Sequence, residues 1–186
     1  MWAARLSVRN RWALVGMIVV LAFALIDRPS IRRMGFHLPT TFGAGVVVVV
    51  SLIAMACLVL FVHWAGGEIP ATPTWPNLTQ SSGYLVWALM QEFILQSFFF
   101  TRCEELFGGA TAVWVAATLF AAAHLPNPIL TTFTLIAALF FCEMFRRYRS
   151  IYPIAFVHAA LGLTVAVTMP DSLLHHMRVG IGYLQY

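Results

Sequence analysis

Three ionisable side chains lie inside segments that are otherwise apolar. Glu92 and Gln96 lie four residues apart in the segment 82–102, a spacing that places both side chains on one face of a helix. His124 ends a second apolar segment in Phe-Ala-Ala-Ala-His, and His158 lies inside a third. An ionised side chain near the middle of a bilayer costs about 2.5–3.5 kcal/mol. Its presence therefore predicts a polar partner and a functional role.

A carboxylate and two imidazoles in lipid can activate a water molecule in two ways. In the first, Glu92 takes a proton from water, one histidine orients that water, and the other stabilises the oxyanion of a peptide carbonyl. In the second, the same three side chains bind zinc and leave one coordination position open for water. Spacing does not separate the two, although the zincin motif His-Glu-x-x-His is absent.

Small residues flank both histidines. Ala121, Ala122 and Ala123 precede His124, and Gly162 lies four residues after His158. Small side chains let a neighbouring helix approach closely. We therefore expect the two histidines and the buried glutamate to share one polar site.

Apolar helices must position these residues. The chain has 186 residues, of which 61% are hydrophobic and 10% are charged, whereas about 25% of residues are charged in an average soluble domain. A membrane-spanning helix needs about 20 mostly apolar residues. The candidate spans, separated by Gly- and Pro-rich breaks, are 12–26, 43–65, 82–102, 109–124, 129–145 and 151–168. We expect one integral membrane domain over residues 1–186, an all-α, multi-pass transmembrane helical bundle of about six membrane segments.

Arginine placement predicts the topology. All 11 basic residues are arginine, and the loops 27–33 and 146–150 hold three each, whereas the loops 66–80 and 125–128 hold none. Cytoplasmic loops carry an excess of basic residues. The arginine-rich loops should therefore meet on one side of the membrane, and the net charge of +4 indicates topology and not a nucleic-acid partner. The C-terminal tail from residue 170 is amphipathic and is expected to lie in the membrane interface.

The order of these motifs resembles the CPBP family, which comprises the CAAX prenyl endoproteases and bacteriocin-processing proteins. The first motif of that family, Glu-Glu-x-x-x-Arg, aligns with Gln91–Gln96, its second, Phe-x-x-x-His, with Phe120–His124, and its third, His-x-x-x-Asn, in part with His158–Gly162. The resemblance covers about residues 80–168, the CAAX-protease-like core. It implies an intramembrane protease of glutamic type.

Three positions depart from the family pattern. Gln91 replaces the first glutamate, which the family uses as catalytic base, Gln96 replaces the arginine, and Gly162 replaces the asparagine that supports the oxyanion site. The resemblance leaves two interpretations. Either Glu92 has taken the role of the base, or the chain is a relative that no longer cleaves.

The function implied by the resemblance is an endopeptidase that hydrolyses a peptide bond of a membrane-anchored or lipidated protein. Glu92 is expected to be the base, His124 to orient the water and His158 to bind the oxyanion. The expected supporting residues are Gln91, Gln96, Phe120 and Gly162.

This function needs no cofactor, and the expected partners are membrane lipids and a membrane-anchored protein or peptide. The expected location is an integral position in the bacterial cytoplasmic (inner) membrane. Two alternatives stay open: a non-catalytic protein that binds a partner helix or lipid in the same polar groove, and a zinc-dependent membrane hydrolase with Zn²⁺ on the same three side chains.

Overall fold

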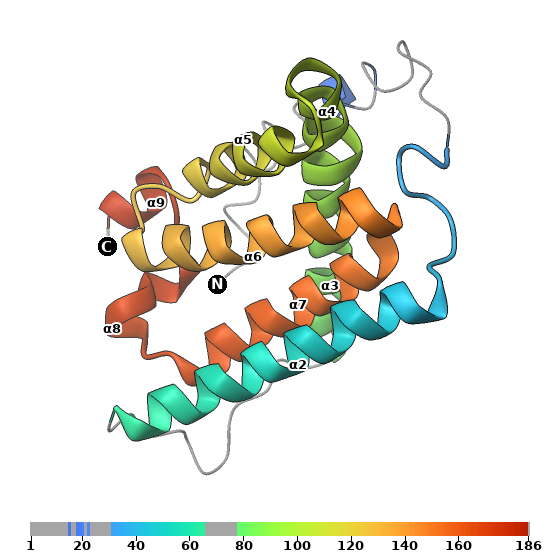
Figure 1. Cartoon of the computed structure of the whole chain (residues 1–186). Helices are drawn as coiled ribbons and strands as arrows, with labels where there is room; N and C mark the ends of the chain where they lie inside the picture. The colour runs from blue at the N-terminus through green and yellow to red at the C-terminus, as the bar shows by residue number, and fades with distance from the viewer. Residues whose placement is uncertain (1–14, 16–17, 21, 23–30, 66–77, 186) are drawn as a thin grey trace.

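The computed structural model describes residues 15, 18–20, 22, 31–65 and 78–185, and the regular elements within them are all helical (Figure 1). The elements are α2 (Thr41–Trp64), α3 (Leu78–Glu92), the π-helix η2 (Phe93–Phe100), α4 (Thr101–Phe107), α5 (Gly109–Ala122), α6 (Pro128–Tyr148), α7 (Ile151–Thr168), α8 (Asp171–Leu174), the 3-10 helix η3 (His175–Met177) and α9 (Ile181–Leu184). Most of the predicted span 12–26 and of the loop 66–80 lies outside the described residues. The other five predicted spans each coincide with a helix or a helical run.

Local signals set several helix ends. The Thr40 hydroxyl accepts a hydrogen bond from the N–H of Gly43 at 3.1 Å and caps α2. The Asn127 Oδ1 accepts one from the N–H of Leu130 at 3.0 Å and caps α6. Side-chain oxygens at these positions satisfy N–H groups that have no partner inside the helix. Gly108 separates α4 from α5 with a φ of +79°, a backbone conformation that glycine adopts without steric cost.

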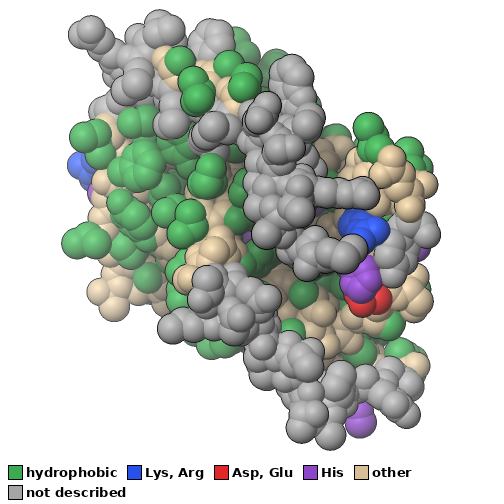
Figure 2. All heavy atoms as spheres, turned by 180° about the vertical axis from the view of Figure 1, so that it is seen from behind, with side chains coloured by type: hydrophobic (Ala, Val, Ile, Leu, Met, Phe, Trp, Pro, Cys, Tyr) green, Lys and Arg blue, Asp and Glu red, His purple; other side chains and the backbone are tan. Residues whose placement is uncertain are grey.

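Membrane-length helices make up much of the bundle. Within the described residues, α2, α6 and α7 are long and apolar enough to cross a membrane, and α5 is a shorter apolar helix. The predicted span 82–102 lies in the consecutive elements α3, η2 and α4. Figure 2 shows hydrophobic side chains gathered on the left part of the face that it draws. Such a face suits contact with lipid, where apolar side chains need no covering by protein.

The core lies where η2, α5, α6 and α7 meet. Large buried side chains fill it: Leu95, Phe100, Phe141, Phe145 and Ile154. Small buried residues on α5 let the neighbouring helices approach: Ala112, Ala116, Ala117 and Ala121.

The expectation for the alanines before the first histidine holds only in part. Ala121 is buried, whereas Ala122 and Ala123 are exposed. The helix ends at Ala122, so the later alanine belongs to the turn and not to a helix–helix contact.

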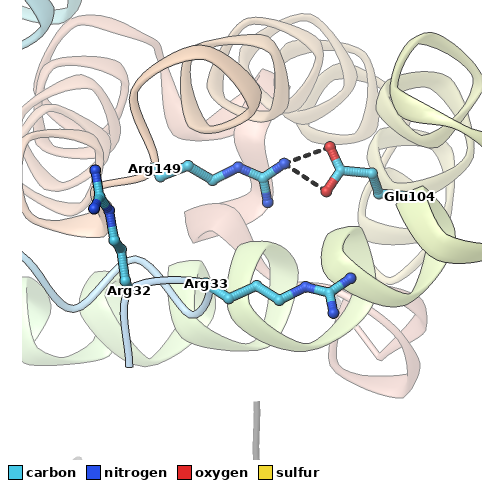
Figure 3. Close-up of a pocket in the computed structure, with 4 residues that line it drawn as sticks. All are labelled: Arg32, Arg33, Glu104 and Arg149. Atoms are coloured by element: carbon cyan, nitrogen blue, oxygen red, sulfur yellow. Dashed lines mark hydrogen bonds and ion pairs between the residues drawn. The ribbon is translucent and has the colours of Figure 1, made fainter. Parts of the chain in front are cut away.

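The arginine-rich segments meet at one end of the bundle, as their sequence pattern predicts. Arg33 pairs with Glu105 at 2.6 Å, and Arg149 forms an ion pair with Glu104. A cavity of about 290 Å³ at this end is lined by Arg32, Arg33, Glu104 and Arg149 (Figure 3). These ion pairs link the segment before α2, helix α4 and the end of α6.

The C-terminal tail packs against the opposite end. Asn127 is fully buried and donates from Nδ2 to the carbonyls of Leu174 at 2.9 Å and Arg178 at 3.2 Å. The N–H of Gly180 donates to the carbonyl of Leu125 at 2.8 Å. The tail is therefore held by the turn that follows α5, in addition to any contact with the membrane interface.

Candidate functional site

The Glu92 carboxylate is the centre of the buried polar cluster. Glu92 is 0% exposed at the end of α3. His158, on α7, places Nδ1 2.7 Å from Oε1 of Glu92, and Gln96 Nε2 donates to Oε2 at 3.1 Å. When Glu92 is ionised its oxygens can only accept hydrogen bonds, and Nδ1–H of the imidazole is then the donor in this pair. The cluster thus joins α3 to α7 through one short hydrogen bond.

The helix widens directly after Glu92. Residues Phe93–Phe100 form a π-helix, and the N–H of Thr101 bonds to the carbonyl of Gln96, five residues earlier. π-helical turns are rare and occur frequently at functional sites. This one carries Gln96 and follows the glutamate immediately. The irregular backbone is therefore part of the architecture that holds the polar cluster.

Aromatic rings surround the His158 imidazole. Phe141 stacks on it with ring centroids 5.7 Å apart and an interplanar angle of 26°, and Phe120 approaches edge-on at 6.4 Å. The side chain is 16% exposed, whereas that of Glu92 is 0% exposed. Nε2 has no hydrogen-bond partner among the described residues. This nitrogen is the part of the pair that can meet water or a substrate.

His124 approaches the cluster from the end of α5. Its Nδ1 donates to the carbonyl oxygen of Phe120 at 3.0 Å, and its ring lies 5.2 Å from the Phe120 ring. A carbonyl can only accept, so a neutral His124 has a free acceptor at Nε2. The Phe120 ring lies against both imidazoles, with ring centroids 5.2 Å from His124 and 6.4 Å from His158. The structure therefore joins Glu92 directly to His158, and the Phe120 ring connects His158 to His124.

The Gln96 amide is only half satisfied. Its Oε1 is buried and has no hydrogen-bond partner among the described residues, while the buried Cys142 of α6 lies beside the same side chain. An unpaired buried acceptor costs about 1–3 kcal/mol. A water molecule or a peptide N–H that reaches this oxygen would recover part of that free energy.

The other two expected supporting residues differ in what they contact. Gln91 is partly buried, and within the described part of the chain it makes no hydrogen bond to Glu92 or to either histidine of the site. Gly162 lies against Tyr84 of α3, and a Cβ at Gly162 would meet the Tyr84 hydroxyl oxygen at 2.1 Å. Sequence reasoning did not identify Tyr84. Its only signal was a hydroxyl-bearing residue eight positions before Glu92, about two helical turns away.

A bound metal ion requires several ligand side chains that converge on one point. Within the described residues, no group of three His, Cys, Asp or Glu side chains is arranged to hold one. Glu92 and His158 direct Oε1 and Nδ1 at each other. A zinc ion on the three predicted ligands would therefore require these side chains to rearrange.

Similarity to known proteins is concentrated in the middle of the chain. A family model described as type II CAAX prenyl endopeptidase Rce1-like matches residues 73–164. No curated protein and no solved structure matches the chain. The matched range contains all the residues that the sequence motifs singled out: Gln91, Glu92, Gln96, Phe120, His124, His158 and Gly162.

Proposed function

The chain belongs to the CAAX protease family, and on that premise we propose that it is an intramembrane endopeptidase in which Glu92 and His158 act together to activate water. Its helices form an all-α membrane bundle of that family. The observation that carries the proposal is the 2.7 Å contact between a fully buried carboxylate and a partly exposed imidazole. A carboxylate that accepts from one imidazole nitrogen fixes the tautomer, so the other nitrogen is left without a proton and can accept one.

The geometry supports activation of water by Glu92 and His158 together and not by Glu92 by itself. Glu92 has no exposed surface and both of its oxygens accept hydrogen bonds. His158 Nε2 would take the proton from water, and Glu92 would stabilise the imidazolium. The hydroxide then attacks the peptide carbonyl carbon. Collapse of the tetrahedral intermediate breaks the C–N bond, and the imidazolium gives its proton to the leaving amine.

His124 is proposed to orient the water. Its Nδ1 is fixed on the Phe120 carbonyl, which leaves Nε2 to accept a hydrogen bond from water. The ring of Phe120 fixes the imidazole in turn through the contact at 5.2 Å. Gln96 Oε1, which has no partner within the part of the chain that the structure describes, supplies a second acceptor for water or for a substrate N–H.

The proposed substrate is a membrane-anchored or lipidated protein. The aromatic residues Phe120 and Phe141 line the imidazole of the pair, and an apolar site in a membrane bundle favours a substrate that already partitions into lipid. The matching family model names prenyl endopeptidases. A farnesylated peptide that ends in Cys-aliphatic-aliphatic-X is therefore the first substrate to test.

The test uses the full chain in proteoliposomes with an internally quenched farnesylated peptide of this type. Glu92→Gln keeps size and hydrogen-bonding atoms but removes the carboxylate, and the cleavage rate should fall about 10²- to 10⁴-fold. Glu105→Gln is the matched control because Glu105 is exposed and pairs with Arg33 at the arginine-rich end of the bundle. Equal rates for wild type and Glu92→Gln would refute the catalytic role.

A second candidate is a non-catalytic relative that binds a partner helix or lipid in the same groove. Three motif positions favour it, because Gln91, Gln96 and Gly162 replace the family's glutamate, arginine and asparagine. The same assay separates the two functions. A binder gives no cleavage with any variant, whereas the protease gives cleavage that depends on Glu92.

A further inference from the structure

Gly162 leaves a space on α7 that a side chain from α3 fills. A Cβ at this position would lie 2.1 Å from the Tyr84 hydroxyl oxygen and 2.9 Å from two carbons of its ring. Gly162 follows His158 by one helical turn, about 6 Å along the helix axis at 1.5 Å per residue. The phenol therefore reaches the segment of α7 next to the proposed base.

The same two helices form both contacts. Tyr84 of α3 meets Gly162 of α7, and Glu92 of α3 meets His158 of α7. Because residue numbers rise along one helix and fall along the other, the helices are antiparallel and the two contacts share one interface. Tyr84 is partly buried, and its hydroxyl makes no hydrogen bond to a described residue, so its proton can be donated to another acceptor.

The proposed reaction needs a donor that the pair does not supply. Nδ1 of His158 already donates to Glu92, and Nε2 must be unprotonated to take a proton from water. While the tetrahedral intermediate forms, no N–H of His158 is free for the carbonyl oxygen, which becomes an oxyanion. An independent neutral donor beside His158 would fill this role.

We propose that Tyr84 is a further catalytic residue, whose hydroxyl donates a hydrogen bond to the carbonyl oxygen of the scissile peptide as that oxygen becomes negative. This inference rests on the proposed endopeptidase function. The phenol keeps its proton throughout, so the water proton still passes through His158 to the leaving amine. Gly162 is the residue that permits the phenol to lie there.

The first experiment tests the contact without using activity. Gly162→Ala places a methyl group against the Tyr84 oxygen, and overpacking of this kind destabilises a core. The melting temperature in detergent should fall, and Gly162→Ala combined with Tyr84→Ala should recover most of the loss. Gly45→Ala is the control, because a Cβ there meets no atom of a described residue within 4 Å. A Gly162→Ala protein as stable as the control would overturn the contact and the proposal built on it.

The second experiment tests the role with the farnesylated peptide in proteoliposomes. Tyr84→Phe removes only the hydroxyl oxygen, and kcat should fall about 10²- to 10³-fold, the usual effect of losing one oxyanion donor, while KM changes less than about threefold. Tyr152→Phe removes a hydroxyl from an exposed position at the start of α7 and should leave kcat unchanged. In a Tyr84→Ala background, Gly162→Asn offers a donor from α7 and should recover part of the lost kcat.

The outcomes separate this inference from the function on which it rests. Cleavage that depends on Glu92 but proceeds at the wild-type kcat in Tyr84→Phe overturns the donor role and leaves the endopeptidase standing. Absence of any cleavage that depends on Glu92 overturns both. A large loss of kcat in Tyr84→Phe, with an unchanged melting temperature, supports the donor role.

Discussion

The contact between Glu92 and His158 predicts a measurable energetic coupling across the α3–α7 interface. The contact is 2.7 Å long, and the carboxylate is 0% exposed. Hydrogen bonds to charged groups contribute about 1.5–3 kcal/mol to stability. The perturbation that isolates this value is a double-mutant cycle of Glu92→Gln and His158→Phe.

Each single variant should behave differently in that cycle. His158→Phe removes the donor and leaves the Glu92 carboxylate with one hydrogen bond among the described residues, from Gln96. This variant should therefore lower the free energy of unfolding by about 1.5–3 kcal/mol. Glu92→Gln removes a buried acid that is costly in an apolar environment, and its amide can still bond to the imidazole. The effect of Glu92→Gln should therefore be smaller.

The double variant gives the decisive number. With the carboxylate already replaced, His158→Phe should cost only a neutral hydrogen bond of about 0.5–1.5 kcal/mol, in place of about 1.5–3 kcal/mol in the wild type. A coupling of at least about 1 kcal/mol is the expected result. The assay is reversible unfolding of the purified full chain in mixed detergent micelles, with Glu105→Gln as the control. Strict additivity of the two changes would show that the residues do not interact and would remove the basis of the proposed pair.

Two further predictions test the metal alternative and the anchoring of the tail. A glutamic mechanism uses no metal ion, so chelators should leave the cleavage rate unchanged; one zinc per purified chain, lost in His124→Ala, would establish the zinc-dependent hydrolase in its place. Asn127→Ala removes a helix cap and two hydrogen bonds to the tail, and it should lower stability by about 2–4 kcal/mol. Residues 171–185 should then exchange amide hydrogens faster than α7 does, and unchanged exchange in the tail would contradict the anchoring role.

The fold predicted from the sequence follows from local properties of the chain. Apolar run length and Gly- and Pro-rich breaks predicted the span 151–168 with the same bounds as α7, and 43–65 within two residues of α2. Both signals act over one helix at a time, because a spanning helix must satisfy its own backbone hydrogen bonds and present apolar side chains to lipid. The clustering of the arginine-rich segments followed for a similar reason, since loops on one side of a membrane share one end of the bundle.

The sequence also identified Glu92, His124 and His158 as polar residues in apolar segments, because a charged group in lipid is costly wherever its partner lies. Which group binds the carboxylate is a different question. His158 is 66 residues away in the chain, and its contact depends on how α3 and α7 are rotated and spaced. The sequence by itself gives no information about that rotation, and separate roles were therefore predicted for Glu92 and His158.

Only the tertiary structure decided the remaining features of the site. The π-helix after Glu92 has no local signature in the apolar sequence, because the register of backbone hydrogen bonds is set by packing. The approach of Tyr84 to Gly162 could not be predicted from the glycine that replaces the family's asparagine. The side chain that occupies the space beside Gly162 comes from another helix, α3. Local composition thus determined which segments are helices and which residues are costly in lipid. The three-dimensional packing of the helices determined which of those residues meet, because side-chain contacts depend on interhelical rotation and depth.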